Sequence, residues 1–417
     1  MNILIINHYA GSPKHGMEYR PYYLAKEWLK LGHKVTIIAA SQSHLRQQQP
    51  LTTNKITREN IEGINYTWLK TPEYRGNGFR RVLNMLSFGK QLYYSYPKIL
   101  SEFSPDLVIA SSPHPFIIRG AKRIAKQYKA KLIFEVRDLW PLSLIELGNI
   151  NPLHPFVLLM KNEEEFAYKE SDSIVSLLSN ASGYMQQHGM SKNKFRYIPN
   201  GIIIDNNEIS HKTSKAQTAL SPEIEKKLQH IKQNHVLLVC FAGSHGIANA
   251  LDYLIDAASI LASTQAKEAI GFILVGSGSE KNKLKAKASM LQNVFFFDPI
   301  QKAEIPIFLK KMDVLYIGLQ KQNIFKYGVS PNKLFDYMMA AKPIIHAIET
   351  ENNIIEKSGC GISCKAENAS AIAKAIMQIK NTTENKRILM GEKGKKYVIE
   401  HHNYQVLAKN YLLTNNN

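Results

Sequence analysis

A lysine beside the start of a predicted helix is the residue with the clearest chemical potential in this sequence. Residues 329–345, VSPNKLFDYMMAAKPII, are typical of a polar loop, a short helix and a buried strand. Ser330 and the proline after it suit an N-cap and a first helical position. The free backbone N–H groups there, together with the ammonium of Lys333, would suit a phosphate. Asp336, one turn later, can accept hydrogen bonds from a ribose. The alternative is a capped surface helix with solvated charges.

Two further groups of candidate residues follow predicted buried strands. The segment 105–114 ends in His114, and the segment 131–141 contains Arg137-Asp138 just after its apolar run. Ligands of open parallel sheets bind beyond the carboxyl ends of the strands, so these side chains lie where chemistry is expected. For His114 alone a structural histidine is equally consistent. Arg137 and Asp138 could also be an ion pair that holds a loop.

Glycine-containing loops leave three predicted strands. Gly16 closes the loop after the first strand, at residues 3–6, and allows close approach of the backbone to a ligand. In the second half, the strand before residue 243 runs into Gly-Ser-His-Gly, and the strand before residue 276 runs into Gly-Ser-Gly-Ser-Glu. Glycine exposes backbone N–H groups to phosphate, so the two loops of the second half, together with the polar loop of residues 329–345, predict a nucleotide pocket. The sequence contains no GxGxxG, the usual dinucleotide fingerprint.

The elements that carry these residues alternate between strand and helix. Residues 3–6, a loop, an apolar helix up to Gly32 and a strand at 35–40 form a β-loop-α-β unit, and the pattern restarts at residue 236. With 417 residues, the chain is too long for one ordinary core. We predict an α/β protein with two domains. The predicted parts are an N-terminal domain at 1–204, a polar linker at 205–235, a nucleotide-binding domain at 236–394 and a C-terminal segment at 395–417.

The charge balance limits the partners. The formal net charge is +19, with 44% hydrophobic and 21% charged residues. Nucleic acid, an anionic membrane face or an anionic substrate would each explain this charge. The basic residues are scattered and no nucleic-acid-binding motif is present, so we favour a membrane surface with a phosphorylated substrate over nucleic acid.

Cysteine usage and hydropathy give expectations about the compartment. Three cysteines form neither a disulfide framework nor a metal-binding spacing, which is typical of a reducing compartment. The apolar N-terminal stretch is too short for a signal peptide, and no run approaches the roughly 20 residues of a membrane-spanning helix. We therefore expect a cytoplasmic protein whose contact with a membrane is peripheral.

Residues 74–90 could provide that contact. Arginines cluster in a glycine-containing turn, and an apolar segment with Phe79, Leu83, Met85, Leu86 and Phe88 follows. Such a segment could rest among lipid headgroups. The alternative is a helix that buries its apolar side in the core and only begins in solvent.

Taken together, the chain resembles the retaining nucleotide-sugar glycosyltransferases of the GT-B fold, in family 4. The segments that carry the resemblance are Gly16-Met17-Glu18, Ile198-Pro199-Asn200-Gly201 and residues 329–345. Within the family it is similar to bacterial surface-polysaccharide (O-antigen and capsule) transferases, including those that add N-acetyl-L-fucosamine. The narrower match rests on residues 7–13, 137–141 and 330–334.

The resemblance implies two Rossmann-like domains with parallel sheets that face each other across a cleft. It implies a UDP-sugar donor on the C-terminal domain, an acceptor on the N-terminal domain, and a C-terminal helix that returns to the N-terminal domain. It also implies transfer with retention of configuration, without an essential metal or other cofactor. Positive charge and N–H donors can stabilise a diphosphate leaving group in place of a cation. The donor-binding residues predicted on these grounds are Gly16, Gly243, Ser244, His245, Gly276, Gly278, Glu280, Ser330, Asn332, Lys333 and Asp336.

This sequence departs from the family pattern at three places. The first acid of the frequent Glu-x7-Glu pair is Gly328, while Asp336 takes the place of the second. The usual Arg and Lys after the first strand of the C-terminal domain are Ser244 and approximately Asn249. The familiar phosphate clamp is therefore absent, and Lys333 is the best local cation.

The third departure concerns the His-Asp pair that many relatives carry after a later strand of the N-terminal domain. Here the pair is Arg137-Asp138. The role of the family histidine near the reacting sugar then falls to Arg137 or to His114, and we predict all three residues as catalytic.

Three functions remain open from the sequence. The leading one transfers a sugar, such as an N-acetylated 6-deoxyhexose, from a UDP-sugar to a polyprenyl-diphosphate-linked acceptor at the inner face of the cytoplasmic membrane. A UDP-sugar 2-epimerase of the same architecture would turn over donor without acceptor. A non-catalytic sugar-nucleotide-binding protein would explain the missing acid at Gly328 and the missing Arg-Lys clamp.

Overall fold

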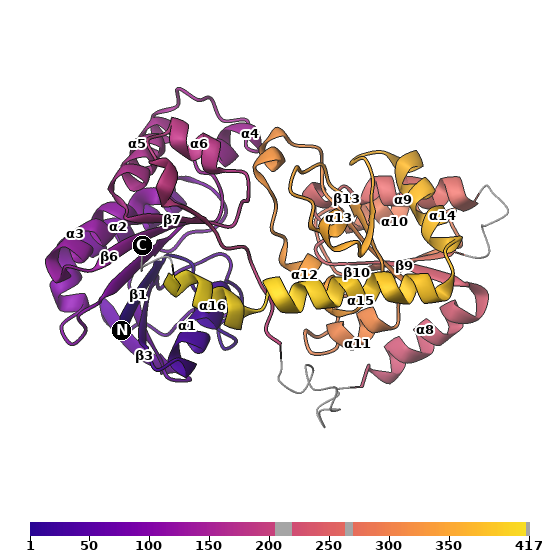
Figure 1. Cartoon of the computed structure of the whole chain (residues 1–417), viewed down its shortest axis with the longest axis horizontal. Helices are drawn as coiled ribbons and strands as arrows, with labels where there is room; N and C mark the ends of the chain where they lie inside the picture. The colour runs from indigo at the N-terminus through magenta and orange to yellow at the C-terminus, as the bar shows by residue number, and fades with distance from the viewer. Residues whose placement is uncertain (205–218, 263–269, 414–417) are drawn as a thin grey trace. The chain divides into compact units, whose positions relative to one another are not determined.

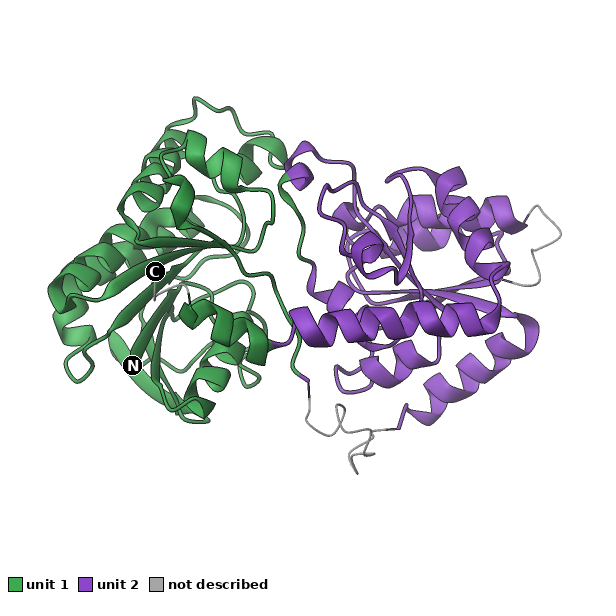
Figure 2. Cartoon of the chain, viewed as in Figure 1, with its two compact units in different colours: residues 1–203, 327–330, 404–417 green, residues 204–326, 331–403 purple. Residues whose placement is uncertain are grey.

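The chain forms two compact units (Figure 2), and the computed structural model describes residues 1–204, 219–262 and 270–413. Unit 1 comprises residues 1–203, 327–330 and 404–417, and unit 2 comprises residues 204–326 and 331–403. The sequence placed the first boundary at 204 and the return of the C-terminus at 395. The excursion of residues 327–330 into unit 1 was not predicted.

Unit 1 is built on an eight-stranded sheet with the order β3-β4-β2-β1-β5-β6-β7-β8. All neighbouring pairs are parallel except β3 and β4, which form an antiparallel hairpin at one edge. The central strands are nearly continuous apolar runs because both faces of the sheet are covered. The strands are β1 (Asn2–Asn7), β2 (Lys34–Ala40), β3 (Ile56–Ile61), β4 (Ile64–Leu69), β5 (Leu107–Ser111), β6 (Lys131–Val136), β7 (Ser173–Ser176) and β8 (Phe195–Tyr197).

Helices cover both faces of this sheet (Figure 1). One core joins the sheet to α2, α3, α5 and α6, and the other joins it to α1 and α16. The C-terminal helix α16 is fixed to α1 because the indole N–H of Trp28 donates to the carbonyl of Ala408 at 3.0 Å. The helical elements are α1 (Arg20–Lys30), α2 (Phe79–Ile99), η1 (Pro115–Ile117), α3 (Ile118–Tyr128), α4 (Leu142–Glu146), α5 (Pro155–Glu170), α6 (Ser182–Gln187), η2 (Lys192–Lys194) and α16 (Tyr404–Leu413).

Unit 2 has a six-stranded, fully parallel sheet with the order β11-β10-β9-β12-β13-β14. One face packs against α9, α10 and α14 in a single apolar core. The strands are β9 (Leu237–Ala242), β10 (Ile270–Val275), β11 (Val294–Phe297), β12 (Val314–Gly318), β13 (Ile344–Ala347) and β14 (Gly361–Ser363). The helical elements between residues 222 and 401 are α8 (Pro222–Asn234), η3 (Ile247–Asn249), α9 (Leu251–Ala262), α10 (Lys281–Lys287), α11 (Ile305–Lys310), η4 (Asn323–Tyr327), α12 (Asn332–Met339), α13 (Ile354–Ser358), α14 (Ala369–Lys380) and α15 (Glu384–His401).

Three local expectations need correction. The predicted polar linker is partly a helix: α8 buries Leu228 and Ile231, whereas residues 205–218 lie outside the described residues. Helix α12 begins at Asn332 with Pro331 at its N-cap position, so Ser330 does not cap it. The predicted C-terminal helix is divided between α15 in unit 2 and α16 in unit 1.

Candidate functional site

Each sheet has one point at which the strand order reverses, and polar residues gather at both points. In unit 1 the reversal lies between β1 and β5, and in unit 2 it lies between β9 and β12. Ligands of open α/β sheets bind outside the carboxyl ends of the strands at such switch points. The residues that follow β1, β5 and β9, and those that follow β10 beside β9, are therefore the candidates for binding and chemistry.

In unit 2 the loops after β9 and β10 form one rigid floor. Their backbones are joined by hydrogen bonds from Gly243 N–H to Val275, from His245 N–H to Ser277 and from Glu280 N–H to His245, at 2.8–2.9 Å. A Cβ at Gly276 would lie 2.0 Å from the carbonyl oxygen of Gly243, so only glycine permits this approach. The predicted Gly-containing loops are thus fixed to each other before any ligand arrives.

A cavity of about 350 Å³ lies over this floor. Small and apolar residues line it: Ala242, Gly243, Ser244, Val275, Gly276, Ser277, Pro299, Ile300 and Ile305. Its walls come from the carboxyl ends of β9, β10 and β11 and from α11. Its size and its apolar lining with backbone groups suit one flat heterocycle.

Helix α12 places the ammonium of Lys333 beside the floor. Lys333 Nζ donates to the side-chain carbonyl of Asn249 at 2.6 Å and lies 4.5 Å from the centre of the Phe241 ring. A Cβ at Gly243 would lie 3.2 Å from Nζ, so glycine leaves room for the ammonium. The Asn249 amide in turn donates to the carbonyl of Ser244 at 2.9 Å. Asn249, which stands near the position of the family lysine, thus orients the lysine of another helix.

This position changes the proton affinity of Lys333. Burial lowers the pKa of Lys333 from 10.5 to about 8, because the ammonium is partly desolvated and its contacts with Asn249 and Phe241 are with neutral groups. The phenolic O–H of Tyr337, one turn along α12, donates to the carbonyl of Ala242 at 3.1 Å and also accepts from the Ala242 N–H at 2.8 Å. The helix is therefore docked on the end of β9, and Lys333 is a positioned cation whose charge an anionic ligand would stabilise.

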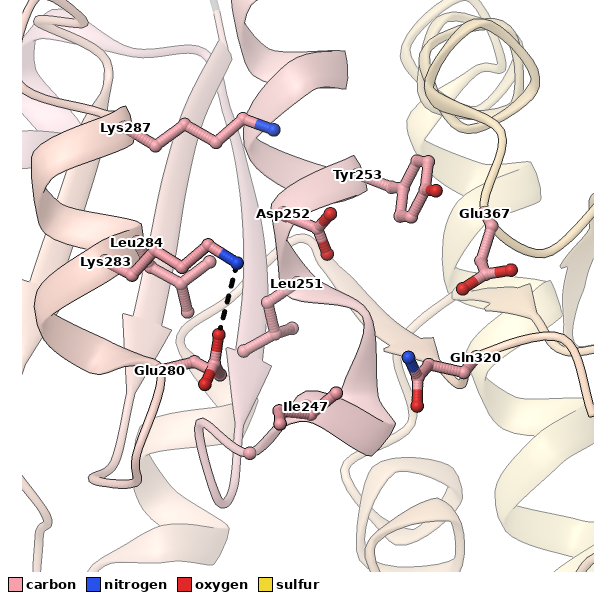
Figure 3. Close-up of a pocket in the computed structure, with 11 residues that line it drawn as sticks. Ile247, Leu251, Asp252, Tyr253, Glu280, Lys283, Leu284, Lys287, Gln320 and Glu367 are labelled. Carbon is pink, nitrogen blue, oxygen red and sulfur yellow. Dashed lines mark ion pairs between the residues drawn. The ribbon is translucent and has the colours of Figure 1, made fainter. Parts of the chain in front are cut away.

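The other predicted donor residues have different surroundings. Asn332 and Asp336 are exposed at the start of α12, and the ring of His245 is fully buried, with a pKa that burial lowers to about 4. Glu280 lines a separate cavity of about 180 Å³ between α9 and α10 (Figure 3), where it faces Lys283 at 3.5 Å. Gly278 lies against the backbone of His245 within the floor.

Residues 327–330 are held by unit 1 and explain the glycine at 328. The carbonyl of Tyr327 accepts a hydrogen bond from the Asn180 N–H at 2.9 Å. The hydroxyl of Ser330 accepts from the Asn200 N–H at 3.0 Å, and the backbone carbonyl of Ser330 accepts from the Asn200 side-chain amide at 2.9 Å. Gly328 has a φ of +113°, and a Cβ there would lie 2.9 Å from the Ser179 nitrogen. The family acid therefore has no space at this position.

Replacing Gly328 by alanine is expected to lower the free energy of unfolding by about 2 kcal/mol or more, because the new Cβ meets backbone and the residue must keep a positive φ. Thermal or denaturant unfolding measures this loss. Gly78→Ala is the matched control, because Gly78 has a negative φ and open space around its Cα. Equal stability of the two variants would contradict the packing argument.

Arg137 in unit 1 is tied to the first loop of the chain. Its guanidinium forms an ion pair with Glu18, and its backbone N–H donates to the hydroxyl of Ser112 at 2.9 Å. Glu18 lies before α1 in a left-handed conformation, with φ +65°, rather than in the first helical turn. Asp138 is exposed, and Gly16, with φ +79°, packs against Gln47. The ion pair that holds this loop is therefore formed by Arg137 with Glu18, whereas the alternative interpretation had paired Arg137 with Asp138.

His114 is the end of a buried hydrogen-bonded relay. Asn84 on α2 donates through its amide nitrogen to the carbonyl of Pro72 at 2.7 Å, which fixes the amide orientation because a carbonyl can only accept. Asn84 Oδ1 therefore accepts from His8 Nε2 at 2.6 Å, and His8 Nδ1 accepts from His114 Nε2 at 2.9 Å. Nδ1 of His114 is then an unprotonated acceptor, and it is buried without a hydrogen-bond partner.

Both histidines of the relay are neutral. Burial lowers the pKa of His114 to about 3, with a further contribution from the charge of Arg81, and it lowers the pKa of His8 well below 6.5. Arg81 also lies 5.8 Å from the centre of the Tyr9 ring and donates to its hydroxyl. The switch point of unit 1 therefore presents an oriented neutral imidazole next to an arginine.

Some of these residues were missed by sequence reasoning. His8 directly follows β1, so the rule that selected His114 after β5 would also have selected it. Asn84 gives no signal, since it lies inside a helix and its partners are residues 71–72 and His8, which are distant in sequence. Lys281 was hidden for a similar reason: three acceptors from two loops surround its ammonium.

Two features are absent from the described residues. Over residues 1–204, 219–262 and 270–413, no cluster of three or more His, Cys, Asp or Glu side chains is arranged to hold a metal ion. Within the same residues, no helix has the length and apolar character needed to cross a membrane.

Comparisons with known protein families agree with this arrangement. Residues 15–206 match the model of glycosyltransferase family 4, and residues 236–381 match the model of glycosyl transferases group 1. Each unit thus contains most of one glycosyltransferase domain, and the fold is the two-domain GT-B architecture. The chain is a GT-B glycosyltransferase. No curated protein sequence matches the chain significantly.

Three solved structures illustrate the likeness in fold. The E. coli structure described as trehalose-6-phosphate bound with UDP-2-fluoro glucose has a TM-score of 0.72 and 10% identity, covering 99% of this chain and 98% of its own. Anabaena HepE in complex with UDP and glucose has a TM-score of 0.63 and 13% identity, with 99% of both chains covered. WaaG, a glycosyltransferase of lipopolysaccharide biosynthesis, has a TM-score of 0.65 and 15% identity, with 98% of both chains covered.

Proposed function

We propose that this glycosyltransferase moves a sugar from a UDP-sugar to a lipid-linked acceptor, with retention of configuration, in the synthesis of a bacterial surface polysaccharide. The single observation that carries the donor half of this proposal is the pairing of the 350 Å³ cavity with the positioned ammonium of Lys333 on one floor. A flat base fits the cavity and a diphosphate suits the lysine. Two of the structures similar in fold contain UDP or a UDP-sugar analogue.

In the proposed reaction the bond between the sugar C1 and the diphosphate oxygen breaks as the acceptor oxygen forms its bond to C1 on the same face. The proton of the acceptor hydroxyl passes to the departing diphosphate, and the transition state resembles an oxocarbenium ion. Lys333 and the backbone N–H groups at the start of α12 stabilise the diphosphate without an essential metal. Asp336 binds the ribose, and Arg137, Asp138 and His114 act near the reacting sugar.

The proposed donor sugar is an N-acetylated 6-deoxyhexose, and the proposed acceptor is a polyprenyl-diphosphate-linked sugar. Both follow from the resemblance of residues 7–13, 137–141 and 330–334 to surface-polysaccharide transferases. WaaG, one of the structures similar in fold, is itself a transferase of lipopolysaccharide synthesis.

Unit 1 has an exposed apolar surface that supports a peripheral location at the inner face of the membrane. Helix α2 buries Met85 and Phe88 but leaves large apolar side chains exposed at its start. The 142–159 segment also exposes large apolar side chains. A small buried cluster of Met85, Phe116 and Met160 joins α2 to η1 and α5. Arg75 and Arg80 are exposed next to this surface. The exposed residues are Phe79, Leu83, Leu86, Leu147, Leu153, Leu158 and Leu159.

Replacing Phe79 and Leu83 together by serine is expected to reduce binding to anionic phospholipid vesicles at least fivefold, because both side chains would otherwise enter the headgroup region. Vesicle co-sedimentation at two salt concentrations measures this. The matched control replaces Ile388 and Leu389 of α15, which are also exposed, by serine and should keep binding unchanged. Similar vesicle binding by wild type and the Phe79/Leu83 variant would refute this surface as the membrane contact.

The function itself is tested by incubating the protein with a panel of UDP-sugars, including UDP-linked N-acetylated 6-deoxyhexoses, and lipid-diphosphate-linked acceptors. The expected product carries a new glycosidic bond with the anomeric configuration of the donor, as NMR of the product would establish. Consumption of donor without a new glycosidic bond would point instead to a 2-epimerase. Binding of UDP-sugar without turnover over a broad acceptor panel would favour a non-catalytic role.

A further inference from the structure

Lys281 is the first residue of α10, a place where a fixed cation is unexpected. The N-terminus of a helix carries partial positive charge, which favours acidic and disfavours basic side chains, and the first turn of α10 contains no acidic residue. Lys281 nevertheless has a side chain that is only 12% exposed. A surface lysine would extend into water, so its burial points to specific partners.

Those partners come from two different loops. Lys281 Nζ donates to the carbonyl of Gly276 at 2.8 Å, to the carbonyl of Phe297 at 3.2 Å and to the carboxylate of Asp298 at 2.7 Å. An ammonium has three N–H donors, so its hydrogen-bonding capacity is fully used. Gly276 follows β10 and Phe297 ends β11, which means that one ammonium joins the carboxyl ends of two neighbouring strands.

Both loops are walls of the 350 Å³ cavity. Gly276 itself lines it, and Phe297 and Asp298 directly precede Pro299 and Ile300, which line the opposite side. The β10–β11 ladder ends at the Val275–Phe297 pair, and a hydrogen bond of 3.3 Å from Gly276 N–H to the carbonyl of Phe297 follows it. The neighbouring Glu280 belongs to the other cavity (Figure 3), so α10 begins between the two. Lys281 therefore joins the two walls at the point where the ladder between their strands ends.

We propose that Lys281 is a positioning residue that holds the loops after β10 and β11 at the separation a nucleobase requires, and thereby sets which base the cavity accepts. The inference rests on the proposed use of a nucleotide-sugar donor. A planar base gains most from close contact along its faces and edges, so a wider slot loses affinity and also loses discrimination between a pyrimidine and a purine. Lys281 does not touch the sugar or the diphosphate in this arrangement.

The contact with Asp298 is the least important of the three. The Asp298 side chain is 90% exposed, and ion pairs open to solvent contribute little. The two carbonyl contacts hold the loops directly and lie within the floor. Separate substitutions can therefore distinguish an ion pair at the surface from a link between the loops.

The experiment measures dissociation constants of UDP, CDP, ADP and GDP by calorimetry for the full chain and four variants. Lys281→Met should weaken UDP binding at least tenfold and reduce the preference for UDP over ADP at least fivefold, because the methionine keeps the volume but cannot hold the carbonyls. Lys281→Arg should recover part of both losses. Asp298→Asn should stay within twofold of wild type, and so should Lys283→Met, which removes a more exposed lysine of the same helix.

In transfer assays Lys281→Met should raise the donor KM while kcat and the acceptor KM stay within twofold. An unchanged UDP-to-ADP preference in Lys281→Met would overturn the proposal, even if its melting temperature falls. If Lys281→Met does not fold, the other two variants decide. Wild-type selectivity for UDP in Lys281→Arg, together with complete loss of that selectivity in Asp298→Asn, would also overturn the proposal. Normal UDP binding by wild type without any sugar transfer would reject the proposed function and leave this inference standing. Absence of nucleotide binding in wild type would reject the base cavity.

Discussion

Replacing Lys333 by alanine is expected to lower kcat/KM for the sugar nucleotide about 10²- to 10³-fold, mainly through the KM for the donor. The reason is that no arginine or lysine stands at Ser244 or Asn249 to share the diphosphate charge, so the ammonium of Lys333 carries most of it. Steady-state kinetics with varied donor, together with calorimetric titration of UDP, measures the loss. Lys310→Ala, which removes an exposed lysine from α11, should leave both values unchanged.

The pH dependence provides a second readout of the same residue. With a pKa of about 8, Lys333 is charged below this pH and neutral above it, so donor affinity should decline as the pH rises through 8, by at most tenfold per pH unit. In Lys333→Arg the guanidinium stays charged, and affinity should be constant between pH 7 and 9.5. Because a bound diphosphate stabilises the charged lysine, wild type should take up protons on binding near pH 8. A donor KM that Lys333→Ala leaves unaltered would exclude Lys333 from diphosphate binding.

The strand-and-loop pattern was enough to predict two α/β units with parallel sheets and the strand ends that the candidate residues follow. Parallel strands buried on both faces have long apolar runs, and polar or glycine residues must follow where the chain leaves the sheet. Gly243, Gly276, His114 and Arg137 were found in this way, and each lies just beyond the end of its strand. The C-terminal return was expected from the family resemblance, and only α16 packs on unit 1.

What the sequence could not indicate depends on contacts between residues far apart in the chain. Ser330 has the right type and position for an N-cap, yet its hydroxyl accepts from the Asn200 N–H, 130 residues earlier. Gly328 was predicted only as a missing acid, whereas the structure shows a glycine in a left-handed conformation against Ser179. The 327–330 segment is thus bound by unit 1 immediately before the helix that presents Lys333, and local propensity carries no information about this.

The same limit applies to the chemistry of individual side chains. Residue type alone cannot say whether His114 is charged or which ring nitrogen bears its proton. Both properties follow from Asn84, whose orientation is fixed by the carbonyl of Pro72. Because both properties depend on the Asn84 amide, a substitution at Asn84 can test the direction of the hydrogen bonds.

Replacing Asn84 by aspartate is expected to reverse the hydrogen bonds of the relay. A carboxylate facing His8 Nε2 favours the imidazolium and raises the pKa of His8. Doubly protonated His8 then donates from Nδ1 to His114 Nε2, so the proton of neutral His114 must move to its Nδ1. The ¹⁵N chemical shifts of histidine-labelled protein distinguish the two ring nitrogens. Wild type should keep Nδ1 of His114 unprotonated between pH 5.5 and 8, because its pKa is about 3.

Activity should follow the tautomer. If an unprotonated His114 Nδ1 accepts a hydroxyl of the reacting sugars, transfer by Asn84→Asp should fall about 10- to 100-fold at pH 6.5 and recover as the pH rises past the new pKa of His8. Wild type should show no ionisation of His8 or His114 in this range. Asn60→Asp, at an exposed position near the end of β3, is the control for adding one carboxylate and should match wild type. The buried carboxylate should also cost about 3 kcal/mol of stability, since it faces the carbonyl of Pro72. A wild-type tautomer of His114 at every pH in Asn84→Asp would show that Asn84 does not set the direction of the relay.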